Sequence, residues 1–208
     1  LIEGSKIVEV GPDLVVASTE KDMSIIDAHG LLAMPGLVNG HFHSPGNFLR
    51  GAVEDYPLEI FMLYEVPPFS DKLPSPRLNY VRTLLSAIEM LKLGITSVHD
   101  DAFYIPYPTQ TEINSLMQAY VDIGMRAVVT IDTANVIEYE KYPFLYDLLP
   151  ESLRQQMAAA PLMSNKDLID LYSWFIDTWN GTFDGRIGTG VSCSAPQRVN
   201  LEYLQALS

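Results

Sequence analysis

Two histidines separated by a single residue, His41 and His43, are the side chains in this sequence most suited to chemistry. They close an apolar run that follows Pro35 and Gly36, a pattern that indicates a buried strand. In an extended strand, residues i and i+2 point to the same face, roughly 6.5 to 7 Å apart along the chain. Two imidazoles placed in this way can converge on one metal ion. A bare His-x-His motif is also compatible with an ordinary pair of half-buried histidines at a strand end.

Strands that alternate with helices must position this pair. After Pro35 we expect strands that end at His43 and that cover residues 95–99, 126–131 and 186–192. We expect helices over residues 78–93, 109–124 and 164–179, and a further helix capped by Asn200. This alternation is typical of a parallel sheet built from right-handed βαβ units.

The polar residues favour a barrel over a doubly wound sheet. They fall at the carboxyl ends of the expected strands: His41, His43, Asp100, Asp132 and Ser192 to Ser194. That edge is the catalytic face of a (β/α)8 barrel. No glycine-rich phosphate loop follows the first strand, which argues against a dinucleotide-binding or P-loop fold. A full barrel needs eight strands and about 250 residues, so four strands predict the first half of a barrel over residues 35–208.

The first 34 residues follow a different pattern. Short β-like runs over residues 6–10, 14–17 and 24–27 are separated by turn signals, without a helix. We therefore predict a small all-β module over residues 1–34.

Composition restricts the partners and the compartment. The 208 residues carry a formal net charge of -13, which argues against a nucleic-acid partner. The single cysteine, Cys193, excludes an internal disulfide, and no apolar segment reaches the ~18 to 20 residues of a membrane span. No charged-then-apolar leader is visible, so we expect a cytoplasmic protein without membrane contact. The chain begins without methionine, and we expect its true N-terminus to lie upstream.

Three segments together resemble a known family: residues 2–12, residues 26–43 (IDAHGLLAMPGLVNGHFH) and residues 48–51 (FLRG). They resemble the amidohydrolase superfamily, and within it the cytosine deaminase and chlorohydrolase-like branch. Residues 94–98 and 124–127 are similar to the family's second and third strand entries. The resemblance implies a metal-dependent barrel paired with a β-sandwich that both chain ends build, so residues 1–34 would be part of that composite module.

The same resemblance implies a metal site. His41 and His43 would be first-strand ligands of one divalent metal, zinc first, with iron or manganese as alternatives. The family's other ligands, histidines on strands five and six and an aspartate on strand eight, have no counterpart before residue 208. We therefore expect a fragment whose general acid and base lie beyond that residue. The fourth strand, residues 186–194, has no lysine, which favours a mononuclear site. Ser194 stands where many such deaminases carry histidine.

Four further residues are candidate site residues. Asp100 would orient a ligand histidine, or alternatively cap the next loop. Arg50, Gln197 and Arg198 would contact the substrate, and a structural salt bridge is the alternative role of Arg50. Period two places His99 and Asp101 on the face opposite Asp100.

The predicted function is hydrolysis of a non-peptide carbon–nitrogen bond in a small heterocyclic substrate. Deamination of an aminated purine, pyrimidine or triazine is the first expectation. Dehalogenation, opening of a cyclic amide and a catalytically inactive binding paralogue are the alternatives. We expect a homo-oligomer, specifically a dimer.

Overall fold

The computed structural model describes residues 1–208 except residues 13, 15–22, 68–69, 71 and 143. The chain divides into two compact units, Leu1–Pro35 and Gly36–Ser208, and each is described by itself.

The first unit contains a small antiparallel hairpin. Strand β1 (Ile2–Glu3) pairs with β2 (Lys6–Ile7), and Ile2 lies opposite Ile7. The strand expected over residues 24–27 is wrong, because these residues form no strand. Ile25 and Ile26 are 83% and 85% exposed, so none of the described strands of this unit covers their apolar side chains. The run expected over residues 14–17 lies largely outside the described residues, and the composite β-sandwich over residues 1–34 stays a prediction.

The second unit is built on a four-stranded parallel sheet. Its order is β3 (Leu37–Phe42), β4 (Ile95–Phe103), β5 (Arg126–Asp132) and β6 (Ile187–Thr189). Neighbouring strands in the sheet are consecutive in the chain and parallel. This order confirms the α/β class and the parallel sheet expected from the sequence. The last strand is shorter than expected, since it covers three residues of the predicted range 186–192.

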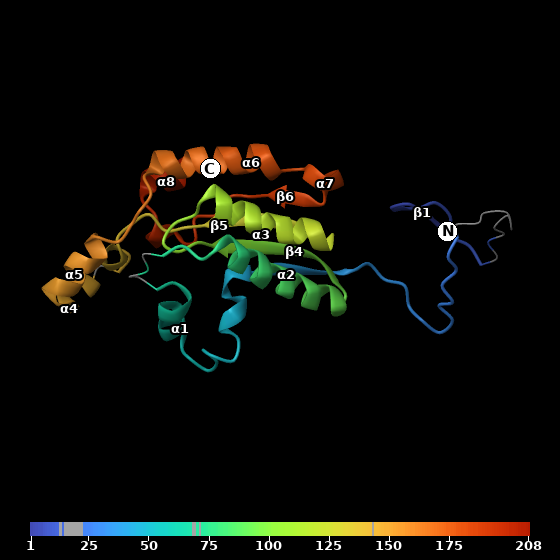
Figure 1. The fold of residues 1–208 in the computed structure, drawn as a ribbon, viewed down its shortest axis with the longest axis horizontal. Coiled ribbons are helices and arrows are strands. Elements are labelled where there is room, and N and C mark those ends of the chain that lie inside the picture. The colour runs from blue at the N-terminus through green and yellow to red at the C-terminus, as the bar shows by residue number, and fades with distance from the viewer. Residues whose placement is uncertain (13, 15–22, 68–69, 71, 143) are drawn as a thin grey trace. The chain divides into compact units, whose positions relative to one another are not determined.

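Helices follow each strand of this sheet (Figure 1). The three longest of these helices begin with a hydroxyl side-chain cap. Helix α2 (Pro76–Lys92) begins after Ser75, α3 (Gln110–Ile123) after Thr109, and α6 (Asn165–Trp179) after Ser164. Each cap hydroxyl accepts a hydrogen bond from a backbone N–H of the first turn, as N-caps do. Gly124 ends α3 with φ +74°, a left-handed conformation that glycine adopts without strain.

Shorter helical segments fill the connections. They are η1 (Ser44–Leu49), α1 (Leu58–Glu65), η2 (Glu138–Glu140), α4 (Leu145–Leu148), α5 (Glu151–Ala158), α7 (Thr182–Gly185), η3 (Pro196–Arg198) and α8 (Leu201–Ala206). Asn200 caps α8 as expected, with its Oδ1 accepting from the Tyr203 N–H.

Alternating residues of the strands give the sheet two different faces. Val98 and Ala102 of β4, and Val129 of β5, lie in one core with the apolar sides of α2, α3 and α6. The alternate strand residues face the other side of the sheet, where Val38 of β3 is 71% and Val128 of β5 is 45% exposed. The carboxyl ends of the strands therefore present one set of side chains to the core and another set away from it.

Candidate metal centre

The two histidines lie side by side at the carboxyl end of β3. His41 is in the strand and His43 directly follows its last residue, Phe42. The pairing with β4 is irregular between Asn39 and Phe42. The two imidazole rings have centroids 4.7 Å apart and are nearly perpendicular, at 84°. His41 is exposed and His43 is half-buried, so the two adjacent rings differ in their access to solvent.

A backbone carbonyl sets the orientation of the His43 ring. The Nδ1 atom of His43 lies 2.6 Å from the carbonyl oxygen of Asp101 in β4. Because a carbonyl oxygen only accepts, we assign the ring proton to Nδ1. This tautomer leaves the lone pair of Nε2 free. Metal-ligating histidines usually donate their other ring N–H in this way, to a carbonyl or carboxylate.

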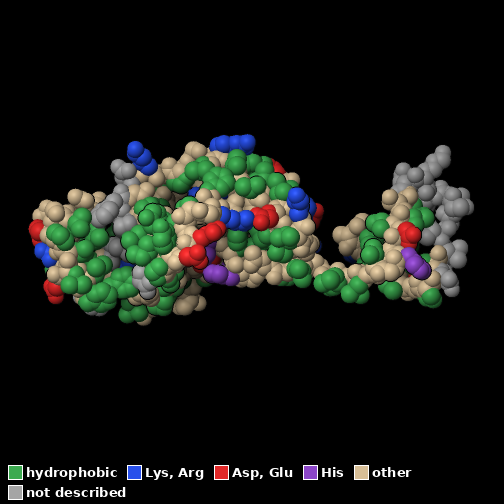
Figure 2. All heavy atoms as spheres, turned by 90° about the horizontal axis from the view of Figure 1, so that it is seen from below, with side chains coloured by type: hydrophobic (Ala, Val, Ile, Leu, Met, Phe, Trp, Pro, Cys, Tyr) green, Lys and Arg blue, Asp and Glu red, His purple; other side chains and the backbone are tan. Residues whose placement is uncertain are grey.

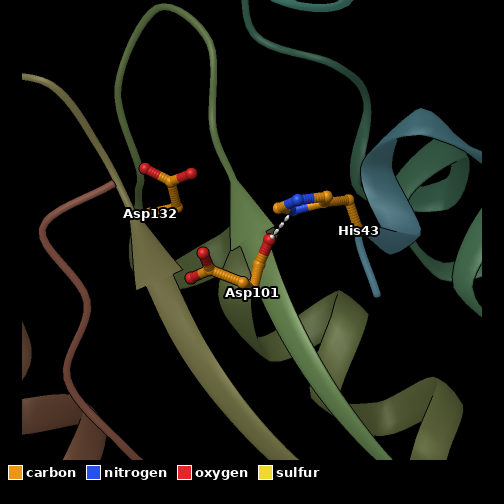
Figure 3. A group of neighbouring side chains, drawn as sticks. All are labelled: His43, Asp101 and Asp132. Carbon is orange, nitrogen blue, oxygen red and sulfur yellow. Dashed lines mark hydrogen bonds between the residues drawn. The ribbon is translucent and has the colours of Figure 1, made fainter. Parts of the chain in front are cut away.

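Two carboxylates from the next two strands converge on His43 (Figure 3). One potential ligand atom from each of His43, Asp101 and Asp132 lies within 4.8 Å of the other two. Asp101 is in β4 and Asp132 is the last residue of β5. The Thr130 hydroxyl donates a hydrogen bond of 2.6 Å to Asp101 Oδ1, which fixes that carboxylate. Three consecutive strands thus contribute one potential ligand each.

Asp132 is held from the other side by the segment after β6. Burial raises the pKa of Asp132, and the charge of Asp101 raises it further. A hydrogen bond from the Ser194 side chain and the charges of Arg198 and His43 lower that pKa. Arg198 donates to Ser194 Oγ over 3.0 Å, so the hydroxyl proton of Ser194 is left for Asp132. Ser194 has φ +63°, a strained conformation for serine that often occurs at functional sites.

A third carboxylate, Glu65, faces the same group from the end of α1. Burial raises the pKa of Glu65, the charge of His43 lowers it, Asp132 raises it and Arg198 lowers it. Three carboxylates therefore face one guanidinium here, which is a surplus of negative charge that a cation would balance. In the view of Figure 2, side chains of both charges and a histidine lie next to each other in the middle of the second unit.

Asp100 lies behind the site, in the core. Its side chain is fully buried, and burial raises its pKa although hydrogen bonds from Ser44 and Tyr120 lower it. Asp100 Oδ1 accepts from the Ser44 N–H over 2.9 Å, and Oδ2 accepts from the Tyr120 hydroxyl over 2.8 Å. Asp100 thus holds the backbone directly after His43. Its predicted role in orienting a ligand histidine stays a prediction.

The predicted substrate residues do not all lie at this site. Arg198 does, but Arg50 forms an ion pair with Glu89 of α2, and both side chains are about half exposed. Gln197 is exposed in η3 next to Arg198. Substrate binding by Arg50, Gln197 and Arg198 stays a prediction, as does metal binding by His41 and His43. His99 is exposed and stays outside the cluster.

A pocket adjoins the cluster. Its volume is about 260 Å³, and its walls include Phe48, Tyr64, Glu65, Arg82 and Phe103. The ring of Phe103 lies 6.1 Å from that of His43, so the pocket opens beside the candidate ligands. No pattern in the sequence pointed to Glu65 or Arg82, because both belong to elements without any metal-binding motif.

Known proteins match this chain in sequence and in fold. The model of the Amidohydrolase family matches residues 32–207. A 5-methylthioadenosine/S-adenosylhomocysteine deaminase of Carboxydothermus hydrogenoformans is 29% identical over 99% of this chain and 40% of its own length. A 5'-deoxyadenosine deaminase of Methanocaldococcus jannaschii is 32% identical over 68% of this chain and 31% of its own length. The chain thus spans less than half the length of these relatives.

Solved structures share the fold. An atrazine chlorohydrolase from Arthrobacter aurescens TC1, complexed with zinc, aligns with 83% of this chain and 37% of its own, at a TM-score of 0.64 and 17% identity. An adenosine deaminase from Xanthomonas campestris with bound zinc aligns with 84% of this chain and 33% of its own, at a TM-score of 0.59 and 24% identity.

Within the described residues, no helix is both long and apolar enough to cross a membrane.

Proposed function

The chain belongs to the amidohydrolase family, and from this membership we propose that the protein carrying it is a metal-dependent hydrolase that deaminates an aminated heterocycle. The family match and the two deaminase relatives support the reaction class. The observation that carries the proposal is the pair of adjacent imidazoles, of which His43 has Nδ1 bound to a carbonyl and Nε2 free. The composite β-sandwich, the dimer and a cytoplasmic location remain parts of this proposal.

The donor atoms of the site fit a divalent ion. Imidazole nitrogen and carboxylate oxygen together suit zinc, iron and manganese, so zinc is proposed first and the other two as alternatives. His41 and His43 would hold the ion. A bound ion of this kind would lower the pKa of a coordinated water to about 7 and so would supply a nucleophile at neutral pH.

The protein's own groups would bind and orient the substrate. The aromatic walls of the pocket, Phe48, Tyr64 and Phe103, offer surfaces for a planar ring. Arg198 uses one Nη for Ser194, so its other N–H groups can donate to ring nitrogens or oxygens. The substrate is an aminated purine, pyrimidine or triazine, and a nucleoside of adenine is the first candidate because both deaminase relatives are named for such substrates.

An ammonia-release screen tests the proposal. The full protein that carries this chain is incubated with nucleobases, nucleosides and aminotriazines, each with Zn²⁺, Fe²⁺ or Mn²⁺, and bound metal is measured in parallel. We expect ammonia from at least one aminated ring. The variant with His41→Ala and His43→Ala should lose bound metal and at least about 100-fold of the activity.

A matched control uses the exposed histidine on the same sheet. His99→Asn removes an imidazole from β4 that is outside the cluster, so metal content and ammonia release should both stay unchanged. Full metal content in the double alanine variant would contradict the ligand assignment. An absence of ammonia from every aminated ring, with metal bound, would contradict the deaminase assignment.

A further inference from the structure

We propose that Arg82 binds an anionic group, a carboxylate or a phosphate, that the substrate carries in addition to its aminated ring. Arg82 lies in α2 and forms part of the wall of the pocket beside the candidate metal centre. The inference rests on the proposed function, because it names a further property of the substrate of that same site. It gives a role to a buried charge that the proposed hydrolysis does not use.

The guanidinium of Arg82 is buried without a partner. Arg82 is only 9% exposed, and its Nε atom is buried and forms no hydrogen bond. The side-chain hydrogen bonds at this residue involve only its backbone carbonyl oxygen, which accepts from Asn47 and Ser86. Arginine is seldom buried unless it is paired, because a buried charge without a partner costs free energy. An anion in the pocket would supply the missing partner.

The groups nearest to this guanidinium do not fill that role. Burial lowers the pKa of Arg82, and the charges of Tyr104 and Asp100 raise it. The Asp100 oxygens accept from the Ser44 N–H and the Tyr120 hydroxyl, and no ion pair joins Asp100 to Arg82 in the described chain. The Tyr104 hydroxyl is buried and has no hydrogen-bond partner there either. The N–H donors of Arg82 therefore stay available to a ligand.

The pocket extends from the candidate metal centre to Arg82. Glu65 and Phe103 mark the first end: burial raises the pKa of Glu65 and the charge of His43 lowers it, and the Phe103 ring lies 6.1 Å from that of His43. The Arg82 pKa responds to neither Glu65 nor His43, which places its charge away from that end. The exposed Lys72 also lines the pocket. A ring held beside His43 can thus direct an anionic arm toward Arg82.

The chemistry of a guanidinium suits an oxygen anion. Its N–H groups form a planar fork that binds two oxygens of one carboxylate or phosphate at once. Hydrogen bonds to charged groups typically raise affinity by roughly 10- to 100-fold. Arg77 of the same helix differs from Arg82, because it is exposed and its guanidinium lies over the Tyr80 ring, 5.3 Å from the centroid.

The affinities of two matched ligands for the full, zinc-loaded protein that carries this chain test the inference. Purine riboside and purine riboside 5'-monophosphate share one ring, lack the amino group that deamination would remove, and differ only in the phosphate. Calorimetry measures both dissociation constants. We expect the monophosphate to bind roughly 10- to 100-fold more tightly. Arg82→Gln should abolish this preference and leave the affinity for purine riboside nearly unchanged.

A conservative variant keeps the test decisive. Arg82→Lys retains the charge without the planar fork, so the preference for the monophosphate should fall without disappearing. It decides the outcome if Arg82→Gln fails to fold by circular dichroism, and an undiminished preference in Arg82→Lys would then overturn the inference.

Arg77→Gln is the matched control. It removes a positive charge from the same helix but outside the pocket, so the preference should stay as in the unchanged protein. Equal affinities for the two ligands in the unchanged protein would overturn the inference. So would a preference that survives Arg82→Gln or that Arg77→Gln also removes.

Two further arms separate the possible sources of the anion and the two proposals. Inorganic phosphate should weaken the binding of the monophosphate only; if it strengthened the binding of purine riboside, Arg82 would hold a free anion and the inference would be wrong. The expected preference in a protein that releases no ammonia from any aminated ring would overturn the deaminase proposal alone. Ammonia release without that preference would overturn the role of Arg82 alone.

Discussion

The buried carboxylate of Asp100 should contribute more to stability than any other single side chain behind the site. It is fully buried and accepts two hydrogen bonds, from the Ser44 N–H and from the Tyr120 hydroxyl. Replacement by alanine removes the acceptor of both, and each donor left unpaired in the core costs about 1–3 kcal/mol. Asp100→Ala should therefore lower the free energy of unfolding by about 2–6 kcal/mol, a large part of the roughly 5–15 kcal/mol typical of a folded protein.

Two milder variants divide this cost between the two bonds. In Asp100→Asn the amide oxygen still accepts from Ser44, and the amide N–H can donate to the Tyr120 oxygen, so the cost should be about 1 kcal/mol. Tyr120→Phe removes only the donor to Oδ2 and should cost about 1–3 kcal/mol. Urea unfolding of the full protein at pH 7 measures all three. Zinc affinity is measured in parallel, because Ser44 directly follows His43.

A second buried tyrosine serves as the control. The hydroxyl of Tyr104 is buried and has no hydrogen-bond partner among the described residues, so Tyr104→Phe should be neutral or slightly stabilising. If Tyr120→Phe cost no more than Tyr104→Phe, the bond to Asp100 would contribute nothing. If Asp100→Ala cost no more than Asp100→Asn, the whole argument for Asp100 would be refuted.

Three further changes test the helices. Burial raises the pKa of Glu112 above its ordinary value of 4.5, so the folded state disfavours the ionised carboxylate. Glu112→Gln should therefore stabilise the folded protein by about 1 kcal/mol at pH 7, measured in thermal melts. That gain should vanish below pH 4, where the carboxyl is protonated in both states, and a gain independent of pH would contradict the reasoning. Gly124→Ala forces alanine to φ +74° and should lower the free energy of unfolding in urea by about 1 kcal/mol. Gly124→Asn should lower it less, and equal losses in the two variants would argue against backbone strain. Ser164→Ala removes the 3.1 Å cap of the Asp167 N–H and should cost about 1 kcal/mol. Ser164→Thr keeps the hydroxyl, which also donates to the Asp167 carboxylate, and should retain stability; equal costs in both variants would mean that the cap does not contribute.

Local chemistry made much of the barrel half predictable. The helix expected over residues 109–124 begins after Thr109 and ends at Gly124, because a cap hydroxyl and a left-handed glycine mark both ends. The strand expected over residues 95–99 continues to Phe103 in the structure. Its acidic residues disfavour a strand in isolation, but Asp101 and Phe103 pair with Thr130 and Asp132 of the neighbouring strand. Tertiary pairing overrode the local preference there.

The convergence of the site was only partly predictable. The His-x-His spacing placed two imidazoles on one face, and period two placed Asp101 on the face opposite Asp100. The expected strand ends placed Asp132 and Ser194 at the same edge as His43, but no pattern in the sequence indicated that Glu65 of α1 faces this group. The strand predicted over residues 24–27 was wrong for a different reason. Its β-like composition has no partner strand in the described first unit.

The alternation of Asp100 and Asp101 along β4 has a consequence for how this protein can change. These two adjacent residues have separate roles. The Asp100 carboxylate accepts hydrogen bonds in the core, whereas the Asp101 carboxylate lies beside the candidate ligands. Substitutions of Asp101 should therefore change the chemistry of the site with little change in the free energy of unfolding. Substitutions of Asp100 should lower that free energy.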